Sequence, residues 1–280
     1  MIAAMDVGGT HIRCRIFDKR GKVVATEQMR TQETGLIEAI ERIVEKYGIE
    51  RVGISYAGQV HEGVILSAPN IQVDEPKIQA YFMQKHGIEL RIENDLKCAA
   101  LAEYDDWGCE TTLVAASIGT GFGSGIIERG RLFRGVKNLA GEIGHAPYKY
   151  SEIPCGCGNH YCIEASCSGS ALQRWIEHYR LPVGENILHD LKEMDDPRAR
   201  QILENFHEGM LFAVGSLISI VNPELLVLGG GVVQKNPYLV EMVRERIGAY
   251  ALPASVKEAK IVMSRLDDAP LKGAELLIRG

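Results

Sequence analysis

The sequence predicts an α/β protein made of two similar halves, with a cleft between them that binds a ligand. Each half opens with an apolar strand, a Gly-Thr turn and a returning strand, at Met5–Ile16 and again at Val114–Ile127. The chain has 280 residues, 46% of them hydrophobic, which is enough for about two domains. Because clefts between domains are frequent ligand sites, the duplication favours the binding of a small molecule.

The first half predicts an antiparallel meander that leads into a β–α–β passage. IAAMDV is an apolar strand, HIRCRIF alternates as a half-buried strand, and KVVAT forms a third. A helix follows and ends at Gly48, a natural C-terminal cap, with apolar positions at helical spacing: Leu36, Ile40, Val44 and Tyr47. RVGISYAG is the next strand, and residues 58–76 are expected to be loops.

The second half repeats this order of elements and adds long helices. Its glycine-rich return strand runs into a hairpin at Glu128–Arg131, and helices are expected at residues 169–179, 198–221 and 272–280. We therefore expect a small domain of residues 1–113, joined by the last helix at about 268–280. Residues 114–267 form the expected large domain, with a zinc knuckle at 145–162.

Composition and charge exclude several functions. The formal net charge is −6, and nucleic acids and anionic membranes both require a basic face. No apolar run reaches the roughly 20 residues that a membrane span needs. The N-terminus lacks the basic region and small-residue cleavage site of a signal peptide, so we expect a cytoplasmic protein.

Two glycine turns follow buried strands, DVGGT at Asp6–Thr10 and SIGTGFGSG at Ser117–Gly125. Successive N–H groups of such turns can point at one anion, and the hydroxyls of Thr10 and Thr120 add donors. Either turn alone is equally compatible with a hairpin that binds nothing, but the pair favours phosphate. A carboxylate at Asp6 would repel phosphate unless a cation bridged them, which predicts Mg²⁺, through water.

Asn94 and Asp95 stand where a strand gives way to an Ala-rich helix. For an isolated Asn-Asp pair, a helix N-cap is the plainer interpretation. Both roles can coexist, because the helix dipole keeps such an aspartate ionised. Its carboxylate could then accept the proton of a hydroxyl that is being phosphorylated.

Four of the seven cysteines lie within residues 155–167, after a histidine at 145. In a reducing compartment such a cluster favours a metal over disulfides. One imidazole and three thiolates would make a closed tetrahedral site for structural Zn²⁺, from His145, Cys155, Cys157 and Cys162. His160 is a possible competitor of His145, and we expect Cys167 to be free.

Two glutamates, Glu142 and Glu164, lie within three residues of an expected zinc ligand. Two solvated surface glutamates would be the ordinary interpretation. Because the metal would fix their positions, we instead expect them to accept hydrogen bonds from a polyol. Zinc would then shape the wall of a sugar pocket without touching the reacting atoms.

The chain resembles the ROK family of bacterial sugar kinases, within the actin/hexokinase-like superfamily. The resemblance spans nearly the whole chain and is carried, in the order of the family, by DVGGT, ENDLKCAALAE, SIGTGFGSGII, GEIGH, CGCGNHYCIEASCSG and LLVLGGGVV. It implies two similar actin/hexokinase-like (ribonuclease H-like) domains, ATP, Mg²⁺ and a hexose that is phosphorylated on its 6-hydroxyl.

The resemblance also implies residue roles. Asp95 would be the general base, and the sugar contacts would be Asn94, Glu142, His145 and Glu164. Phosphate and nucleotide would lie against the glycine turns, formed by Asp6, Gly8, Gly9, Thr10, Gly119, Thr120, Gly121, Gly229, Gly230 and Gly231. His145 would serve both the zinc and the sugar, and the family leads us to expect a homodimer.

Departures from the family pattern bear on the substrate. Where this chain has Tyr161 the family usually has Gly, and where it has His11 the family often has Lys. A side chain at position 161 could change the backbone conformation of the knuckle. N-acetylmannosamine kinases tend to carry His at Glu142, which favours a neutral hexose of glucose or allose type. N-acetylmannosamine kinase or fructokinase activity is the alternative within the family.

Three other functional classes fit the sequence less well than a kinase does. A non-catalytic sugar-sensing regulator of this family would carry a winged helix-turn-helix ahead of the core, whereas here the first turn begins at Asp6. A zinc-stapled binding protein would be expected to lose the base, but Asp95 is present. A hydrolase is disfavoured because no nucleophile arrangement stands out.

Overall fold

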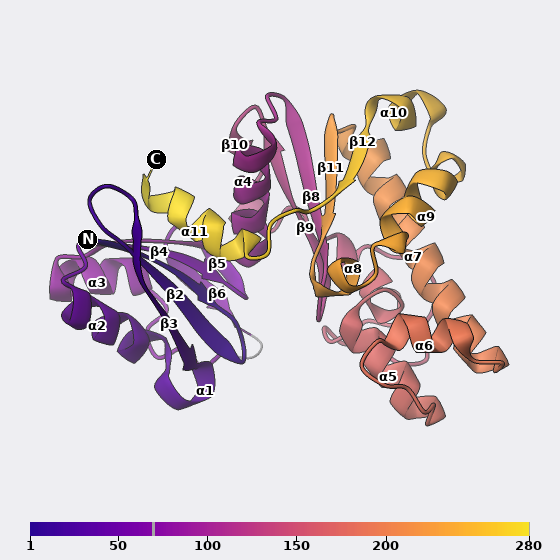
Figure 1. Ribbon diagram of the computed structural model, residues 1–280, viewed down its shortest axis with the longest axis horizontal. Coiled ribbons are helices and arrows are strands. Elements are labelled where there is room, and N and C mark those ends of the chain that lie inside the picture. The colour runs from indigo at the N-terminus through magenta and orange to yellow at the C-terminus, as the bar shows by residue number, and fades with distance from the viewer. Residues whose placement is uncertain (69–70, 280) are drawn as a thin grey trace. The chain divides into compact units, whose positions relative to one another are not determined.

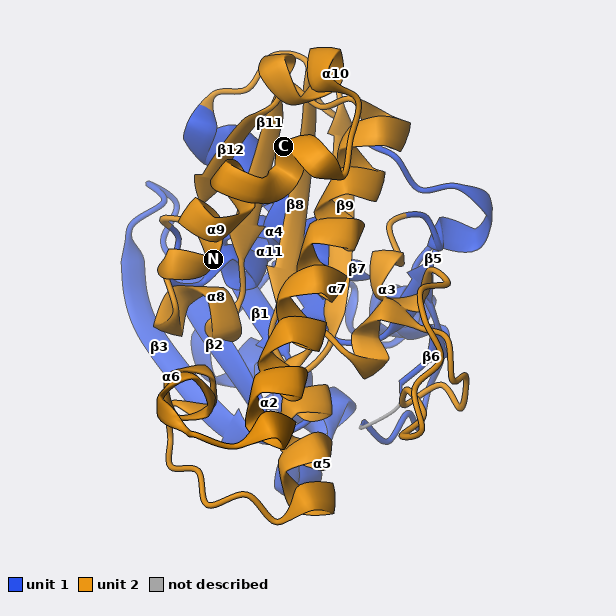
Figure 2. Ribbon diagram, turned by 90° about the vertical axis from the view of Figure 1, so that its right-hand side faces the viewer, with its two compact units in different colours: residues 1–107, 132–140, 266–280 blue, residues 108–131, 141–265 orange. Residues whose placement is uncertain are grey.

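The structure is a computed structural model that describes residues 1–68 and 71–279. The chain divides into two compact units, coloured separately in Figure 2. Unit 1 comprises residues 1–107, 132–140 and 266–280, and unit 2 comprises residues 108–131 and 141–265.

The core of unit 1 is a five-stranded sheet in the order β3-β2-β1-β4-β7. Figure 1 labels β2, β3 and β4 of this sheet. β1 pairs antiparallel with β2 and β2 with β3, whereas β4 and β7 continue the sheet in parallel. The strands are β1 (Ile2–Val7), β2 (His11–Phe17), β3 (Val23–Arg30), β4 (Arg51–Tyr56) and β7 (Glu89–Asn94). The predicted meander and β–α–β passage are therefore confirmed.

Unit 2 repeats this plan in a sheet of the order β10-β9-β8-β11-β12. β8 pairs antiparallel with β9 and parallel with β11, which pairs parallel with β12. The strands are β8 (Thr112–Ile118), β9 (Phe122–Glu128), β10 (Arg131–Leu132), β11 (Leu225–Gly229) and β12 (Lys260–Met263). The duplication inferred from the two Gly-Thr turns thus extends to the strand order of both sheets.

The helices of unit 1 pack on its sheet and include the helix that closes the chain. They are α1 (Thr31–Thr34), α2 (Leu36–Tyr47), α3 (Ile78–His86), α4 (Asp95–Trp107) and α11 (Ala269–Arg279), with the 3-10 turn η1 (Val136–Asn138). Gly48 caps α2 in the left-handed conformation and donates its N–H to the Val44 carbonyl, as predicted.

Unit 2 carries the long helix α7 (Pro197–Val221). Asp196 caps its start by accepting a hydrogen bond from the Arg198 N–H, and Asn222 ends it in the left-handed conformation. The other helices are α5 (Gly169–Tyr179), α6 (Ile187–Glu193), α8 (Gly231–Lys235), α9 (Tyr238–Arg246) and α10 (Pro253–Glu258), with the 3-10 turns η2 (Ile143–His145), η3 (Ile163–Ala165) and η4 (Ile247–Ala249). Within the described residues, no helix has both the length and the apolarity to cross a membrane.

Part of the segment expected to be loops, residues 58–76, is a β-hairpin. β5 (Gln59–His61) pairs antiparallel with β6 (Val64–Ser67), and residues 69–70 lie outside the described part of the chain. Both turn residues are left-handed, Glu62 with φ 49° and Gly63 with φ 76°. This backbone matches the twist of a two-residue hairpin, but glutamate is an unusual first turn residue, so the pattern did not reveal the hairpin.

Two glycines allow α11 to lie directly against the backbone of its neighbours in unit 1. A Cβ on Gly273 of α11 would come 1.9 Å from the Cys98 carbonyl oxygen of α4. A Cβ on Gly53 of β4 would come 2.0 Å from the Ala274 carbonyl oxygen. The C-terminal helix therefore fixes α4, the helix whose first residue is Asp95, by backbone contact.

We expect Gly273→Ala to destabilise the protein by at least about 2 kcal/mol, because the new methyl group overlaps a backbone carbonyl that cannot rotate away. Denaturant unfolding of the purified variant measures the effect. Gly248→Ala is the matched control, since its Cβ would meet no atom within 4 Å. Equal stability of the two variants would contradict close packing of α11 on α4.

Candidate functional site

The turn at Asn94–Asp95 joins β7 to α4, and its side chains bind the first backbone N–H groups of the helix. The Asn94 Oδ1 atom accepts from the N–H groups of Leu96 at 3.1 Å and Lys97 at 3.3 Å. The Asn94 Nδ2 atom donates to the Asp95 Oδ1 atom at 3.0 Å and to the Gly58 carbonyl at 3.1 Å. Asn94 is therefore the capping side chain, and it also holds the Asp95 carboxylate.

This arrangement leaves Asp95 suited to accept a proton. Its Oδ1 atom accepts a second hydrogen bond, from the Leu96 N–H at 2.9 Å, and the residue is only partly buried. Hydrogen bonds to a carboxylate and the positive end of a helix both favour its ionised form. The Asp95 carboxylate is therefore held in a fixed position at the start of α4.

The first glycine turn, between β1 and β2, is tight and tied to its surroundings. The Gly8 N–H donates to the His11 carbonyl at 3.0 Å, and the Thr31 hydroxyl donates to the Gly8 carbonyl at 2.7 Å. Thr10 lies at the exposed end of the turn. The backbone of this turn is thus fixed without any ligand.

Asp6, expected beside Mg²⁺, has protein partners on both oxygens. Its Oδ1 atom accepts from the Ser55 hydroxyl at 2.9 Å, and its Oδ2 atom accepts from Arg13 at 2.7 Å. Arg13 also pairs with Asp268, just ahead of α11. Sequence reasoning missed Arg13, although the hairpin register sets it directly opposite Asp6 and could have revealed the pair.

The second glycine turn, between β8 and β9, is fastened to the start of α5. The Gly119 N–H donates to the Gly121 carbonyl at 2.9 Å, which closes the turn. The Gly169 N–H donates to the Gly119 carbonyl at 2.8 Å, and the Ser170 N–H donates to the Thr120 carbonyl at 3.0 Å. Two segments that are far apart in the sequence therefore meet at this turn.

The third glycine segment lies beside the second. Gly229 pairs with Ser117 in the parallel ladder of β11 and β8, and α8 begins at Gly231. Gly230 has φ 86°, and a Cβ there would come 2.5 Å from the Ile118 carbonyl oxygen. The segment is thus a loop at a helix start. Because Gly230 has no side chain, the loop can lie directly against the second turn.

The expected metal ligands lie together in unit 2. One donor atom from each of His145, Cys155, Cys157 and Cys162 lies within 4.8 Å of the others. The Sγ atoms of Cys157 and Cys162 are 3.5 Å apart, and Cys155 Sγ is 3.7 Å from His145 Nδ1. Metal–sulfur bonds of about 2.3 Å give tetrahedron edges of about 3.8 Å, so this donor set fits a four-coordinate metal.

His160, the possible competitor, is engaged elsewhere. Its Nδ1 atom lies 2.8 Å from the Ser151 carbonyl oxygen, and its ring stacks on Tyr150 with the centroids 5.4 Å apart. It is not in the group of converging donors among the described residues. The arrangement therefore favours His145 as the fourth donor.

The thiols of the cluster differ in their acidity. Burial raises the pKa of Cys162 to about 11 and raises the pKa of Cys155 further. A hydrogen bond from the Asn159 N–H lowers the pKa of the exposed Cys157. Because metals bind thiolates, loading of this cluster would release protons.

Glu164 links the cluster to the second glycine turn. Its Oε2 atom accepts from the Phe122 N–H at 2.8 Å, while its Oε1 atom lies 3.2 Å from Cys155 Sγ. A Cβ on Gly121 would come 2.7 Å from the same Oε2 atom. The expected sugar contact is thus part-buried and fixed by backbone, not a solvated surface glutamate.

Glu142 and His145 flank a glycine that the packing requires. A Cβ on Gly144 would lie 2.0 Å from the Phe122 carbonyl oxygen, so η2 lies directly against β9. Within the described residues, the Glu142 carboxylate makes no hydrogen bond or ion pair. Its contact with a sugar hydroxyl stays a prediction of the resemblance.

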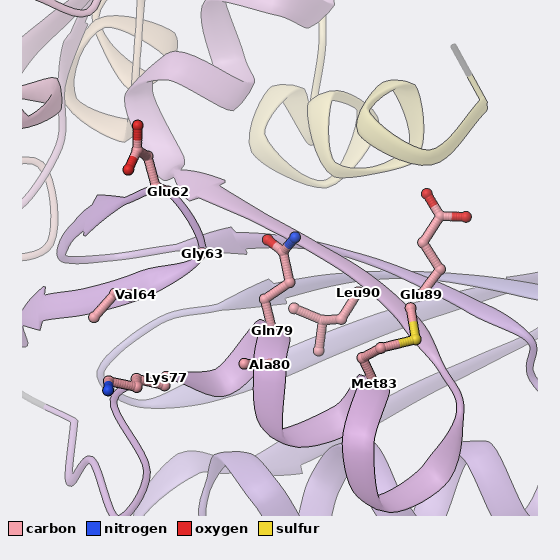
Figure 3. Close-up of a pocket in the computed structure, with 9 residues that line it drawn as sticks. All are labelled: Glu62, Gly63, Val64, Lys77, Gln79, Ala80, Met83, Glu89 and Leu90. Atoms are coloured by element: carbon pink, nitrogen blue, oxygen red, sulfur yellow. The ribbon is translucent and has the colours of Figure 1, made fainter.

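A hollow of about 320 Å³ lies in unit 1 between the turn at Glu62–Gly63, α3 and the start of β7 (Figure 3). Met83 and Gln79 of α3 line it, together with Leu90. It contains none of the site residues expected from the sequence. Leu90 is near the beginning of β7, whereas Asp95 follows the end of that strand.

Fold and site together define a two-unit α/β protein in which each sheet carries a glycine turn after its central strand. The chain belongs to the ROK family, whose sequence model matches residues 2–280. The resemblance noted from its motifs is therefore confirmed.

Individual relatives include both enzymes and a regulator. The chain is 32% identical to an N-acetyl-D-glucosamine kinase of Vibrio cholerae, over 99% of each chain. It is 28% identical to a xylose repressor of Caldicellulosiruptor bescii, over 95% of this chain and 75% of the relative.

Solved structures confirm the predicted actin/hexokinase-like fold. A ROK hexokinase from Thermus thermophilus matches with a TM-score of 0.81 and 28% identity. A ROK glucokinase from Streptomyces griseus, in complex with glucose and AMPPNP, matches with a TM-score of 0.78 and 27% identity. Both matches cover 99% of each chain.

We expect the purified chain to carry one metal ion in the cluster and Cys157→Ser to lose it, because a hydroxyl is a poor substitute for a thiolate ligand. Elemental analysis after gel filtration measures the metal content. Cys109→Ser, outside the cluster, is the control. Wild-type protein without metal would show that this interpretation of the cluster is wrong.

Proposed function

We propose that this chain is an ATP:hexose 6-phosphotransferase with Asp95 as its general base. One observation carries the proposal in a chain of this family: an aspartate is held at the start of α4 by the Asn94 amide and the Leu96 N–H. Positioning and charge stabilisation are what phosphoryl transfer requires of a protein.

The proposed reaction follows from these residues. The sugar 6-hydroxyl oxygen forms a bond to the γ-phosphorus of ATP, the bond to the β–γ bridging oxygen breaks, and ADP leaves. Asp95 accepts the hydroxyl proton. Backbone N–H groups of the turns at Gly8–Thr10 and Gly119–Gly121 would hold phosphate oxygens, and Gly229–Gly231 would lie against the nucleotide.

Mg²⁺ would neutralise the charge of the triphosphate during transfer. Asp6 is the carboxylate expected to hold it, through water. Because Asp6 is already paired with Arg13 and Ser55, its negative charge is partly compensated in the structure as it stands. The aspartate is nevertheless fixed at the turn, where a hydrated cation could reach it.

We propose structural Zn²⁺ as the metal of the cysteine cluster. Three thiolates and an imidazole form a closed set with no open coordination position, which argues against a catalytic metal. Zinc would fix His145 through Nδ1, and the other ring nitrogen could face a sugar hydroxyl. Glu142, Glu164 and Asn94 complete the proposed sugar contacts.

The sugar is proposed to be glucose or allose, on the basis of Glu142 and of the segments THIR and CIEASCSGSALQRW, which look like those of allose kinases in this family. N-acetylmannosamine and fructose are alternatives, and the relatives named N-acetyl-D-glucosamine kinases add a further sugar for comparison. We also propose a cytoplasmic homodimer, as the family resemblance suggests.

A sugar-sensing regulator is the second candidate, because the xylose repressor relative is similar over 95% of this chain. Such a protein would bind the sugar without transferring phosphate. The two candidates therefore differ in a single assay: release of ADP that depends on sugar supports the kinase, and sugar binding without turnover supports the regulator.

We expect Asp95→Asn to lower kcat about 10²- to 10⁴-fold, because the amide cannot accept the hydroxyl proton. Sugar affinity should change little, since the amide keeps the shape of the carboxylate. Coupled ADP-release assays and calorimetry measure the two quantities. Asp105→Asn, an exposed position on the same helix, is the control, and wild-type turnover in Asp95→Asn would remove Asp95 from the mechanism.

A comparison of six sugars tests the substrate. We expect glucose or allose to show the highest kcat/KM, ahead of mannose, fructose, N-acetylmannosamine and N-acetylglucosamine. The expectation rests on Glu142, where N-acetylmannosamine kinases of the family tend to carry His, and on the resemblance to allose kinases. A clear preference for an N-acetylated sugar would contradict this assignment while leaving the kinase proposal intact.

A further inference from the structure

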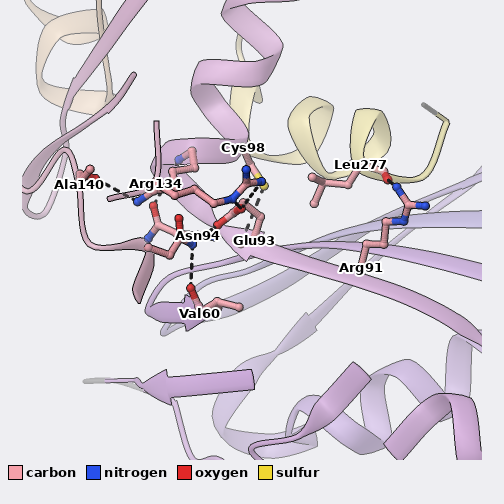
Figure 4. A network of polar contacts seen from close by, with 10 residues as sticks. Val60, Arg91, Glu93, Asn94, Cys98, Arg134, Ala140 and Leu277 are labelled. Atoms are coloured by element: carbon pink, nitrogen blue, oxygen red, sulfur yellow. Dashed lines mark hydrogen bonds and ion pairs between the residues drawn. The ribbon is translucent and has the colours of Figure 1, made fainter. Parts of the chain in front are cut away.

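Glu93 is a buried charge directly ahead of the Asn94–Asp95 turn. Only 5% of the residue is exposed, and burial of a carboxylate is strongly unfavourable unless it is paired and hydrogen-bonded. Its Oε1 atom accepts from the Asn94 N–H at 2.9 Å and from the Asn138 Nδ2 atom at 2.5 Å. Its Oε2 atom accepts from Arg134 through Nε and Nη2, at 3.2 and 3.1 Å (Figure 4).

Arg134 and Asn138 belong to a segment that unit 1 receives from the middle of the chain, residues 132–140. The Asn138 Nδ2 atom also donates to the Val60 carbonyl at 2.7 Å. At the end of the segment, the Lys97 ammonium donates to the Ala140 carbonyl at 3.2 Å. The segment is thus held by Glu93 and Lys97, which stand two residues before and two residues after Asp95.

The backbone of the segment needs this support. Lys137 and Asn138 are consecutive left-handed residues with φ 51° and 63°, and neither is glycine. Such conformations persist only where surrounding contacts determine them. Most of the segment is exposed and only Asn138 is buried, so few apolar contacts can supply that support.

The segment leads without interruption into Gly141 and Glu142, the proposed sugar contact. One buried carboxylate therefore contacts both the turn that carries the base and the chain that enters the sugar site. Of this ion pair only the carboxylate is buried, whereas the Arg134 side chain is half-exposed.

We propose that Glu93 is a positioning residue for sugar phosphorylation. Through Asn94, Asn138 and Arg134 it holds the Asp95 turn and residues 132–140 in one fixed arrangement, so that the base and the chain entering Glu142 are aligned together. This inference rests on the proposed kinase function, and Glu93 itself touches no reacting atom.

Glu93→Gln tests the proposal with a minimal change. The amide oxygen can still accept from the Asn94 N–H and from the Asn138 Nδ2 atom, but the amide NH2 group then faces Arg134 with a second donor and carries no charge for it. We expect kcat/KM for the sugar to fall about 10- to 100-fold, because a small misalignment of reacting groups has an effect of this size. The loss should come mainly from a higher sugar KM. Circular dichroism should show a folded protein.

Three further variants separate alignment from stability. Arg134→Met should reproduce the loss, and Arg134→Lys should restore part of it. Arg91→Met is the matched control, because Arg91 lies on the same strand, β7, and its partners, the exposed Glu89 carboxylate and the Leu277 carbonyl, are not part of the turn. It should keep the wild-type sugar KM. Should Glu93→Gln fail to fold, the arginine variants still decide the outcome.

Hydrogen exchange supplies a readout that needs no activity. Backbone amides of residues 132–140 should exchange faster in Glu93→Gln and Arg134→Met than in wild type or Arg91→Met. Wild-type exchange, or a kcat that falls only with the folded fraction at unchanged sugar KM, would overturn the proposal. If wild-type protein phosphorylates no sugar, the kinase proposal fails, whereas exchange still shows whether Glu93 holds the segment.

Discussion

The position of the proposed base depends on one side-chain amide, that of Asn94. A helix start leaves backbone N–H groups without partners, and here the Asn94 oxygen binds two of them. Its nitrogen binds the Asp95 carboxylate and the Gly58 carbonyl. Because all four interactions use one planar group, the end of β7, the start of α4 and the aspartate cannot move independently. The interactions that cap the helix therefore also fix the proposed base.

The repeated sheet explains why glycine turns recur at equivalent places. In both units a central strand turns back through glycines into an antiparallel neighbour, while parallel strands extend the sheet on its other side. The two glycine turns are held in place by different residues. The first turn is held by Thr31 and lies beside the Asp6–Arg13 pair, whereas the second is held by the start of α5. The same strand order thus produces two rigid turns, of which the first lies beside a charged pair, Asp6 and Arg13.

Local patterns predicted the local structure well. The apolar spacing of α2 and its glycine cap, and the long periodic pattern of α7, each depend on residues within a few positions of one another. The Cys and His spacing likewise anticipated the convergence of four donors. By contrast, Glu93 contacts Arg134 and Asn138, which are more than 40 residues away in the sequence. No periodicity marks such a contact, and a glutamate between an isoleucine and an asparagine looks like any exposed charge until the fold buries it.

Glu164 shows how the proposed metal of the cysteine cluster would affect a neighbouring turn that the metal does not touch. One of its oxygens lies beside Cys155, and the other accepts the Phe122 N–H at the end of the second glycine turn. Ordering of Cys155 by a metal would therefore also order the turn that is proposed to hold phosphate. The Glu164 carboxylate thus links Cys155 to the Phe122 N–H directly. Gly121 leaves room for this carboxylate because it has no side chain. Loss of the proposed metal should thus disorder Glu164 and the second glycine turn together, even though Asp95 lies in the other unit and keeps its own cap.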